Sequence, residues 1–452
     1  MRHGIAPLLV AVLAGACTAP GSSTSSGSSE SADVGSPISQ PVLPKDIPVA
    51  PSSQRVDLTV PRFSHPTTVT NQLFPVSEQG SVLFVGHVDG KPFRTEVTLL
   101  PFTRVIDWGG QQIETLVSQY VAYLDGRLQE VACDLYAQAD DGSVWYFGED
   151  VADLVHGDIV TKEGTWTAGK DGPGQMIMPG DPQVGNVFRT ENIPGIAFEQ
   201  VTVESIDRTL RGPVAQVPGG MVGQELHMDG KTEYKLFAPG YGEFFTRDGK
   251  DVEALATAVP TDALSGGVPQ ELSTLRTNAE RVGQAAAVRR WSSASRIVGL
   301  MDAAWKSFRD GQVPHLEVPW MARAMSALHR EVRARNELRT RQAAIEAEQR
   351  ILDLQLRYRP PVDINLERME LWTQQLLVDA EARDASAVNG DVFTLFYMRD
   401  RILGALTPEQ RTSVNVLIDR LQVAGPEHAL ARATAAASAL GDLVGRIEAA
   451  AA

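Results

Sequence analysis

The sequence predicts an α+β protein of two parts, in which an antiparallel β meander forms a barrel, half-barrel or sandwich and an α-helical bundle follows it. Asp-Gly turns recur between apolar segments up to about residue 256 and then cease, and Ala, Leu, Arg and Glu dominate after about residue 270. The charge changes at the same place. Residues 271–452 carry 24 Arg and Lys against 23 Asp and Glu, so nearly all of the net charge of −15 belongs to the first part. With 452 residues, of which 43% are hydrophobic, the chain can form two or three packed domains.

The first sixteen residues indicate export. A short basic start, Met1-Arg2-His3, precedes the apolar run from Ile5 to Leu13. That run is too short to span about 30 Å of hydrocarbon, so it predicts a signal peptide over residues 1–16. The sequence Leu13-Ala14-Gly15-Ala16-Cys17 resembles the lipobox of bacterial lipoproteins, although Ala14 stands where that family usually has Leu. The resemblance implies cleavage before Cys17 and a diacylglycerol on its sulfur. An ordinary secretory signal followed by a coincidental cysteine is the alternative.

Residues 17–57 are rich in Ser, Gly and Pro and contain few large apolar side chains. Such a segment cannot bury enough surface to offset its chain entropy, so it predicts a flexible tether. A lipid on Cys17 would hold the folded part at the outer face of the cell membrane without inserting it into the bilayer. No later stretch has the roughly 18 uninterrupted apolar residues of a membrane-spanning helix.

Residues 58–256 are expected to form the β domain. Asp89-Gly90, Asp125-Gly126, Asp229-Gly230 and Asp248-Gly249 follow or precede apolar strand-like segments, and Asp140-Asp141-Gly142 separates Leu135–Gln138 from Val144–Phe147. Asp-Gly is a strong signal for a tight hairpin turn, and successive hairpins give antiparallel neighbours. We expect eight to ten strands in this meander.

We expect residues 257–269 to form a linker and residues 270–452 to form the helical bundle. We expect helices over about 269–309 with a break near Ser292-Ser293, 318–357, 365–383 and 387–406. Thr407-Pro408-Glu409-Gln410 is a capping box with Pro at the first helical position, so a fifth helix begins there. Gly425-Pro426 separates a final helix. Apolar side chains at 3–4 spacing on these segments predict packing as a bundle.

Five stretches of the β part, 70–76, 134–149, 164–169, 178–185 and 234–242, resemble a family of uncharacterised bacterial secreted or lipid-anchored β proteins. The longest runs from Asp134 to Glu149 and is similar to the family motif WYAQDxDGxVWYFGE, with Leu135 in place of its Trp. The resemblance covers about residues 65–250. It implies an extracytoplasmic β domain and carries over no activity or site. The helical half resembles no family with an assigned function.

Trp145, Phe147 and Trp166 are the candidate ligand-lining residues, because aromatic side chains can line an apolar cavity in a curved sheet. Strand alternation places Trp145 and Phe147 on one face and Tyr146 on the other. The alternative is that these side chains are core.

Both halves contain candidate cation ligands. Asp134, Asp140, Asp141, Glu149 and Asp150 supply oxygens of the kind that Ca²⁺ takes, but a hairpin turn with solvated acids explains them equally well. In the helical half, His315, His329 and His428 lack Glu-x-x-His or His-x-x-x-His spacing. Glu370, Asp379 and Asp384 could supply a metal site, or could face solvent and pair with Arg368 and Arg383.

The sequence gives little evidence for a catalytic or a nucleic-acid-binding function. Walker A, GxGxxG and GxSxG signatures do not occur, and we expect no cofactor. Cys133, beside Val131 and Ala132, predicts a lone buried thiol if Cys17 is lipidated. Arginines from Arg330 to Arg341 alternate with acids, which favours a salt-bridged surface and no nucleic-acid partner.

The sequence thus predicts an envelope lipoprotein that acts as a non-catalytic binding or interaction module. Its partners would be the membrane, through the lipid, and a small apolar ligand or another envelope protein. One alternative is a metal-handling or sensing protein with the bundle as its metal module. Another is an enzyme with its site between the two halves.

Overall fold

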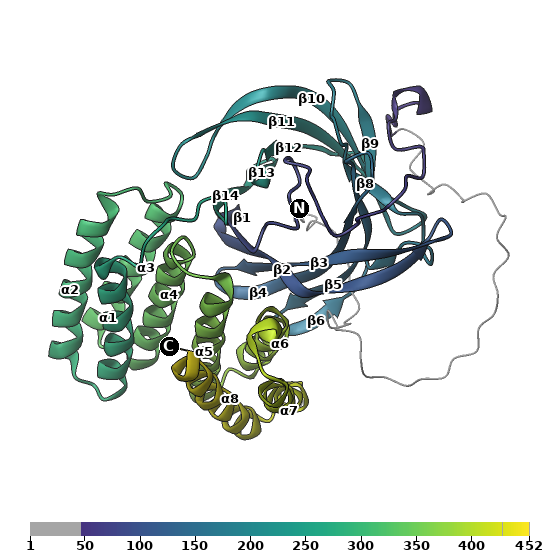
Figure 1. Ribbon diagram of the computed structural model, residues 1–452. Coiled ribbons are helices and arrows are strands. Elements are labelled where there is room, and N and C mark those ends of the chain that lie inside the picture. The colour runs from purple at the N-terminus through teal and green to yellow at the C-terminus, as the bar shows by residue number, and fades with distance from the viewer. Residues whose placement is uncertain (1–46, 427, 452) are drawn as a thin grey trace, which may run out of the picture.

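A computed structural model describes residues 47–426 and 428–451 (Figure 1). Within them a fourteen-stranded antiparallel sheet precedes eight α-helices, which confirms the α+β prediction. The signal peptide, Cys17 and most of the tether lie outside the described residues. No helix of the described part has both the length and the apolar character that crossing a membrane requires.

The strands have the following bounds: β1 Ser81–Val88, β2 Lys91–Trp108, β3 Gln111–Leu124, β4 Arg127–Gln138, β5 Val144–Val155, β6 Asp158–Thr161, β7 Trp166–Thr167, β8 Gln175–Met178, β9 Val187–Ile193, β10 Ala197–Arg211, β11 Gln216–His227, β12 Thr232–Ala238, β13 Gly242–Asp248 and β14 Asp251–Val259. The sheet therefore has more strands than the eight to ten expected, because short strands follow β5 and the second meander is longer than its turn signals show.

Two meanders make up the sheet. Its order is β6-β5-β4-β3-β2-β1-β14-β13-β12-β11-β10-β9, with β7 and β8 paired to β5. The first long strand thus pairs with the last, and the two meanders join at the β1–β14 ladder. No ladder joins β6 to β9 in the described residues, so the sheet is open, and it curls strongly around a concave side (Figure 1).

Backbone geometry explains the hairpins. Asp89 and Gly90 both have positive φ, as do Asp125 and Gly126, which is the conformation that a two-residue type I′ turn requires. Gly109 and Gly110 form a similar turn between β2 and β3, which their Gly-Gly sequence also favours. These short turns keep successive strands antiparallel and fix their register.

Part of the segment assigned to the tether lies against the sheet. The backbone N–H of Val56 donates to the carbonyl of Val187 on β9 (2.9 Å), and Asp57 accepts from the N–H of Arg189 (2.9 Å). These bonds cover part of the free edge of β9, which would otherwise be open to pairing with another chain. The segment free to act as a tether therefore ends before these residues.

The helices have the following bounds: α1 Gln270–Ala287, α2 Trp291–Arg309, α3 Glu317–Ala334, α4 Glu337–Gln355, α5 Pro361–Glu381, α6 Ala385–Ile402, α7 Pro408–Ala424 and α8 Leu430–Ala451. The capping box at Thr407 is present, since its side chain accepts from the N–H of Gln410 and the Gln410 side chain accepts from Thr407. The single helix expected over 318–357 is in fact α3 and α4. Arg335 adopts a left-handed conformation there (φ 51°), and the Asn336 side chain caps α4.

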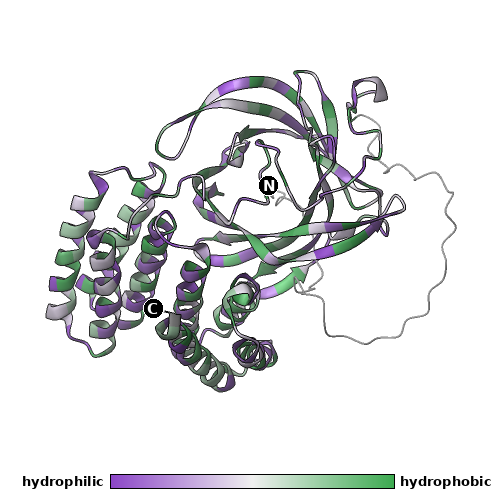
Figure 2. Ribbon diagram, in the orientation of Figure 1, coloured by the Kyte–Doolittle hydropathy of each residue, from purple (hydrophilic) through white to green (hydrophobic). Residues whose placement is uncertain are grey.

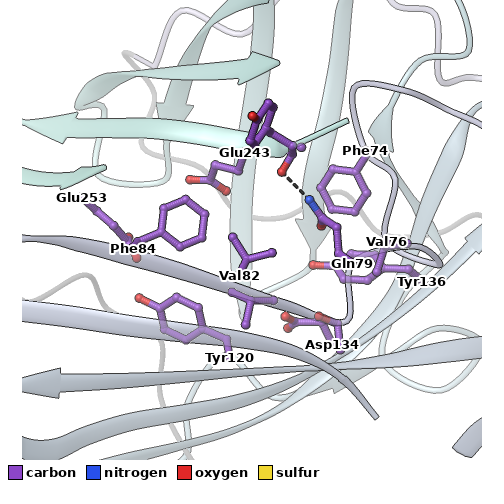
Figure 3. A pocket seen from close by; sticks show the side chains of 14 residues that line it. Phe74, Val76, Gln79, Val82, Phe84, Tyr120, Asp134, Tyr136, Glu243 and Glu253 are labelled. Carbon is purple, nitrogen blue, oxygen red and sulfur yellow. Dashed lines mark hydrogen bonds between the residues drawn. The ribbon is translucent and has the colours of Figure 1, made fainter. Parts of the chain in front are cut away.

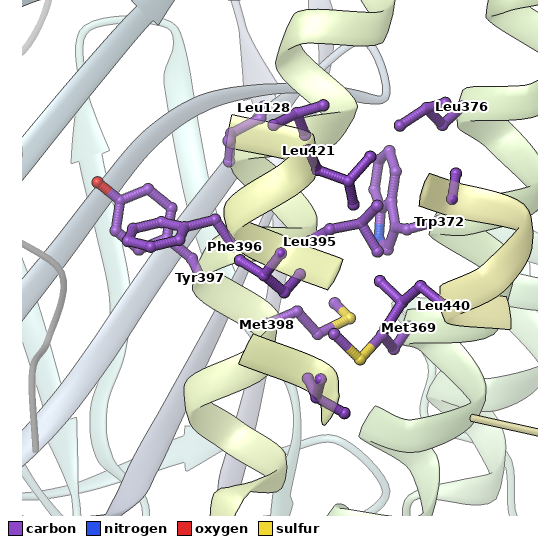
Figure 4. Packing of buried hydrophobic residues seen from close by; sticks show 14 of the residues in the cluster. Leu128, Met369, Trp372, Leu376, Leu395, Phe396, Tyr397, Met398, Leu421 and Leu440 are labelled. Atoms are coloured by element: carbon purple, nitrogen blue, oxygen red, sulfur yellow. The ribbon is translucent and has the colours of Figure 1, made fainter. Parts of the chain in front are cut away.

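The helices and the sheet share a hydrophobic core. Tyr123 and Leu128 from the sheet belong to the same buried cluster as residues of α5, α6, α7 and α8 (Figure 4). The rings of Tyr123 and Trp372 stack with centroids 5.5 Å apart. Hydrophobic and hydrophilic residues both occur along the strands and around the helices (Figure 2), as expected for elements that bury one side in a core.

A buried ionic network joins β2 to three helices. Asp353 of α4 accepts from Arg94 of β2 (2.5 Å) and from Arg368 of α5 (2.6 Å), and Arg350 donates to its other oxygen (2.8 Å). Glu96, two residues beyond Arg94, pairs with Arg401 of α6. Burial disfavours the ionised form of Glu96, but the surrounding arginines outweigh it and hold its pKa well below the usual range. The helical half and the sheet are thus held together by charge as well as by apolar packing.

The β5–β6 turn is a second attachment point, and it predicts a mutational effect. A Cβ on Gly157 (φ +80°) would lie 1.9 Å from the Ser386 carbonyl oxygen at the start of α6. Gly157→Ala is therefore expected to cost the left-handed penalty of about 1–2 kcal/mol and about 1–3 kcal/mol more for overpacking. Gly126→Ala is the matched control, since it has the same backbone conformation (φ +77°) and open space around it. Equal losses of unfolding free energy in urea titrations of the two variants would contradict this contact.

Cys133 on β4 is completely buried. It is disulfide-bonded, so the expectation of a lone thiol is wrong. The chain contains one other cysteine, Cys17, which lies outside the described residues.

Candidate functional site

A cavity of about 120 Å³ lies on the concave side of the sheet (Figure 3). The strands around the β1–β14 junction supply most of its wall, and the segment before β1 supplies the rest. Its lining residues are Phe74, Val76, Gln79, Val82, Phe84, Val97, Ser118, Tyr120, Asp134, Tyr136, Tyr241, Gly242, Glu243 and Glu253. Apolar, aromatic and acidic side chains therefore face one another across a small space.

Strand alternation places these side chains on one face. Val82 and Phe84 are two residues apart on β1, and Asp134 and Tyr136 are two residues apart on β4. The ladder pairs Val82 with Val97 and Val97 with Tyr120, so neighbouring strands add to the same wall. A shift of one residue in any of these ladders would turn the lining away from the cavity.

The segment 61–80, which we call the strap, forms the rest of the wall. The Asn71 side chain donates to the carbonyls of Gly142 (3.0 Å) and Pro179 (2.9 Å). The Gln138 side chain accepts from the N–H groups of Thr70 (2.7 Å) and Asn71 (3.0 Å). These hydrogen bonds fix the strap across the end of β4 and the turn before β5. They join residues far apart in the sequence and hold Phe74 and Val76 against the cavity.

Four of the five stretches quoted for the resemblance meet at the strap. Stretch 70–76 provides Asn71, which binds the turn at Gly142 in stretch 134–149 and Pro179 in stretch 178–185. In stretch 234–242, the Gly240 N–H donates to the Gln72 carbonyl (2.8 Å). These four segments thus form one structural feature beside the cavity, the strap and the residues that bind it.

Three carboxylates reach the cavity. Asp134 accepts from the Tyr146 hydroxyl (2.9 Å), Glu253 accepts from the Thr95 hydroxyl, and Glu243 accepts from Thr246 (2.5 Å). Burial raises the pKa of Asp134 to about 7, against the lowering effect of its tyrosine hydrogen bonds. Burial, assisted by Glu243, raises the pKa of Glu253 to about 7. The cavity wall therefore gains negative charge as the pH passes through neutrality.

The acidic wall continues around the concave side. Asp134 lies opposite Glu149 in the β4–β5 ladder, and Glu191 lies opposite Glu199 in the β9–β10 ladder. Burial and then repulsion from Glu199 raise the pKa of Glu191 to about 8, and the same two causes raise that of Glu225 on β11 to about 8. Part of the acid of the β half thus lies on an interior face.

Two cations balance one part of this face. His227 Nδ1 lies 3.3 Å from Glu199, and Lys235 Nζ lies 2.6 Å from Glu225. Burial opposes charge on both members of the His227–Glu199 pair, but their hydrogen bond outweighs it. The pKa of Glu199 falls to about 2 and that of His227 rises to about 10.

Glu199, Glu225 and His227 also have ligand atoms within 4.8 Å of one another, and they are the one group of potential metal ligands that the described residues contain. The Lys235 ammonium group already lies against Glu225, and His227 favours its protonated form. This arrangement is typical of an internal ion-pair network, because a metal would have to displace a proton and an ammonium group.

The three candidate ligand-lining residues lie in the core beside the cavity and are not part of its wall. Trp145 and Phe147 contact Phe63 of the strap and Trp108, with ring centroids 5.5–6.4 Å apart. Trp166 is fully buried and donates to Glu191 (2.9 Å). Their role in the structure is to support the strap and to orient an interior carboxylate.

The other predicted acids are dispersed. Asp140 accepts from Ser64 of the strap, Asp141 accepts from Ser143 within the turn, and Asp150 pairs with Arg104. They therefore do not converge on a cation, and the hairpin interpretation of Asp140-Asp141-Gly142 agrees with the geometry.

In the helical half, His315 contacts the Pro213 carbonyl and His329 contacts Asp302. Asp379 is buried and pairs with Arg127 of β4. The expectation that it faces solvent and pairs with Arg383 or Arg368 is wrong, because the sheet covers that face of α5. Arg368 is buried in the network around Asp353.

Sequence reasoning missed the acidic face. Its signal was present around Asp229-Gly230, where Glu225 and His227 precede the turn and Glu233 and Lys235 follow it at alternate positions. Charged residues at period two on paired strands indicate a polar face. Tyr120, Glu243 and Glu253 carry no local pattern, since only the closure of β1 on β14 brings them together.

No protein-family model and no curated protein matches the chain. The inference of function therefore rests on the cavity and the acidic face.

Proposed function

We propose that the chain is an exported lipoprotein of a bacterial envelope and a non-catalytic binding module, with its ligand in the cavity beside the strap. The single observation that carries this proposal is the cavity itself, in which apolar and aromatic walls meet a few polar groups. Small-molecule sites in proteins have this composition.

The architecture supports this use. The helices pack on the outside of the curved sheet and leave its concave side to the strap (Figure 1). The wall residues belong to long strands and to a hydrogen-bonded strap, so the cavity is formed before a ligand arrives. Preformed sites lose less free energy to ordering on binding.

A cavity-filling variant tests this function. Val97→Phe adds volume inside the cavity, whereas Val155→Phe adds the same volume at an exposed position of β5. Wild type and Val155→Phe, purified from native membranes, are expected to release the same small molecule on denaturation, as measured by mass spectrometry. Val97→Phe is expected to release at least tenfold less. Equal release from all three proteins, or none from wild type, would overturn the proposed site.

The lipid anchor has its own test. Cys17→Ser is expected to move most of the protein from the membrane fraction to the soluble fraction, because the chain would lose its acyl chains. One sulfur cannot carry both a diacylglycerol thioether and a disulfide, so the proposed lipidated form has Cys133 as a thiol and differs in that bond from the structure. Mass spectrometry of the N-terminal peptide from wild type is expected to show the lipid mass. A disulfide-linked peptide, or a variant that stays membrane-bound, would contradict lipidation.

Metal handling is the alternative proposal. Its candidate ligands among the described residues are Glu199, Glu225 and His227, which lie in the sheet, whereas the sequence pointed to the bundle. Elemental analysis of the purified chain decides between the two: a stoichiometric transition metal supports metal handling, and its absence leaves the cavity as the site.

A further inference from the structure

We infer that the cavity selects a small organic cation, an ammonium group attached to a short apolar body. This inference rests on the proposed function and names the class of its ligand. It follows from the charge of the wall, from its aromatic content and from its size, which are independent observations.

Charge is the first of these. The described residues that line the cavity include Asp134, Glu243 and Glu253 and no lysine, arginine or histidine. Lys235, which is not part of the lining, lies 2.6 Å from Glu225 and acts on Glu243 and Glu253 only through its electrostatic field. An anionic ligand would face three carboxyl groups without a counter-charge in the lining, whereas an ammonium group would be attracted to those that are ionised.

The aromatic rings are the second observation. Tyr120 and Tyr136 rise from the sheet on the same side as Asp134, and Phe84 lies beside Glu253 (Figure 3). The faces of aromatic rings attract cations, and sites for alkylated ammonium ions combine such rings with acidic groups. The valines between the rings supply contact surface for an apolar body but offer nothing to a strongly hydrated metal ion.

Size is the third. The volume of about 120 Å³ is close to that of engineered cavities that hold one benzene molecule, about 150 Å³. A chain of about four carbons with one ammonium group fits this space, whereas a nucleotide or a folded peptide does not.

Isothermal titration of the full-length chain in detergent with three probes of one shape tests the inference. The probes are n-butylammonium, n-butanol and butyrate. Butylammonium is expected to bind at least tenfold more tightly than butanol, and butyrate is expected not to bind. The double variant E243Q/E253Q is expected to reduce butylammonium affinity at least tenfold and to leave butanol affinity within twofold. Glu204→Gln, on an exposed position of β10, is the matched control and is expected to bind like wild type.

The outcomes separate the ligand class from the function. Equal affinity for butylammonium and butanol, or an E243Q/E253Q variant that binds like wild type, would overturn the cation inference and leave the cavity a binding site. Binding of butyrate alone would also overturn it. No heat with any probe overturns the inference, and the ligand-release experiment with Val97→Phe then decides separately whether the proposed function stands. Circular dichroism of the double variant checks that it is folded.

Discussion

Replacing Asp353 by asparagine is expected to destabilise the folded chain by about 3–5 kcal/mol, the cost of breaking a buried ion pair by removing one partner. The carboxylate is only 2% exposed and accepts from Arg94, Arg350 and Arg368. Asparagine has the same shape but removes the negative charge, so Arg94 and Arg368 would retain only Glu96 as an acidic partner, and Arg350 only Glu346. The loss should affect the sheet and the helices together, because Arg94 belongs to β2 and the other two arginines to α4 and α5.

Urea denaturation followed by far-ultraviolet circular dichroism and by tryptophan fluorescence measures this effect. Asp419→Asn, at an exposed position of α7, is the control and is expected to change the unfolding free energy by less than about 0.5 kcal/mol. A change below about 1 kcal/mol for Asp353→Asn would show that the network is not what joins the two halves. Separate transitions for the two probes would show that the halves unfold independently.

Raising the pH from 6 to 9 is expected to lower the unfolding free energy of the ligand-free protein by at least about 2 kcal/mol. The pKa values of Glu191 and Glu225 are raised to about 8 in the folded state by burial, and that of His227 is raised to about 10, where its hydrogen bond with Glu199 outweighs burial. The folded state therefore holds protons that the unfolded chain releases. Stability from each raised carboxyl is lost between its unfolded pKa, near 4, and its folded pKa. For His227 the loss begins above about 6.5.

Buried carboxyls of the helical half act in the same direction, since burial raises the pKa of Glu317 to about 8. Glu191→Gln tests the contribution of the acidic face, because glutamine can still accept from Trp166 but cannot ionise. The variant is expected to have a flatter stability profile and to exceed wild type at pH 9, whereas Glu204→Gln should follow the wild-type profile. Urea midpoints measured at each pH check this. A wild-type stability that rises from pH 6 to 9 would show that these carboxyls are ionised in the folded state.

Local signals predicted the elements of this fold well. The Asp-Gly turns at Asp89 and Asp125 and the capping box at Thr407 depend on backbone geometry within a few residues, and the structure contains each of them. The division near residue 260 followed from the change of turn chemistry and charge. The break at Arg335 was missed because arginine rarely adopts a left-handed conformation, although Asn336 after it is a good N-cap.

The site could not be predicted in this way. Glu253 and Tyr120 meet because β14 pairs with β1, β1 with β2 and β2 with β3. The β14–β1 closure joins residues more than 160 positions apart, which no local pattern encodes. Likewise, Arg94 and Asp353 look like surface charges in the sequence, and only the packing of α4 on β2 buries them. Aromatic residues in a long motif instead drew attention to Trp145, which proves to support the strap.

The position of the bound ligand tests the central claim most directly. Methyl groups of Val76, Val82 and Val97 line the cavity, whereas those of Val298 and Val414 lie in the helices. In methyl-resolved nuclear magnetic resonance spectra, addition of n-butylammonium is expected to shift the three cavity valines and to leave the two helical valines unchanged. Shifts confined to the helical valines, with unchanged cavity signals at saturating ligand, would contradict a binding site on the concave side of the sheet.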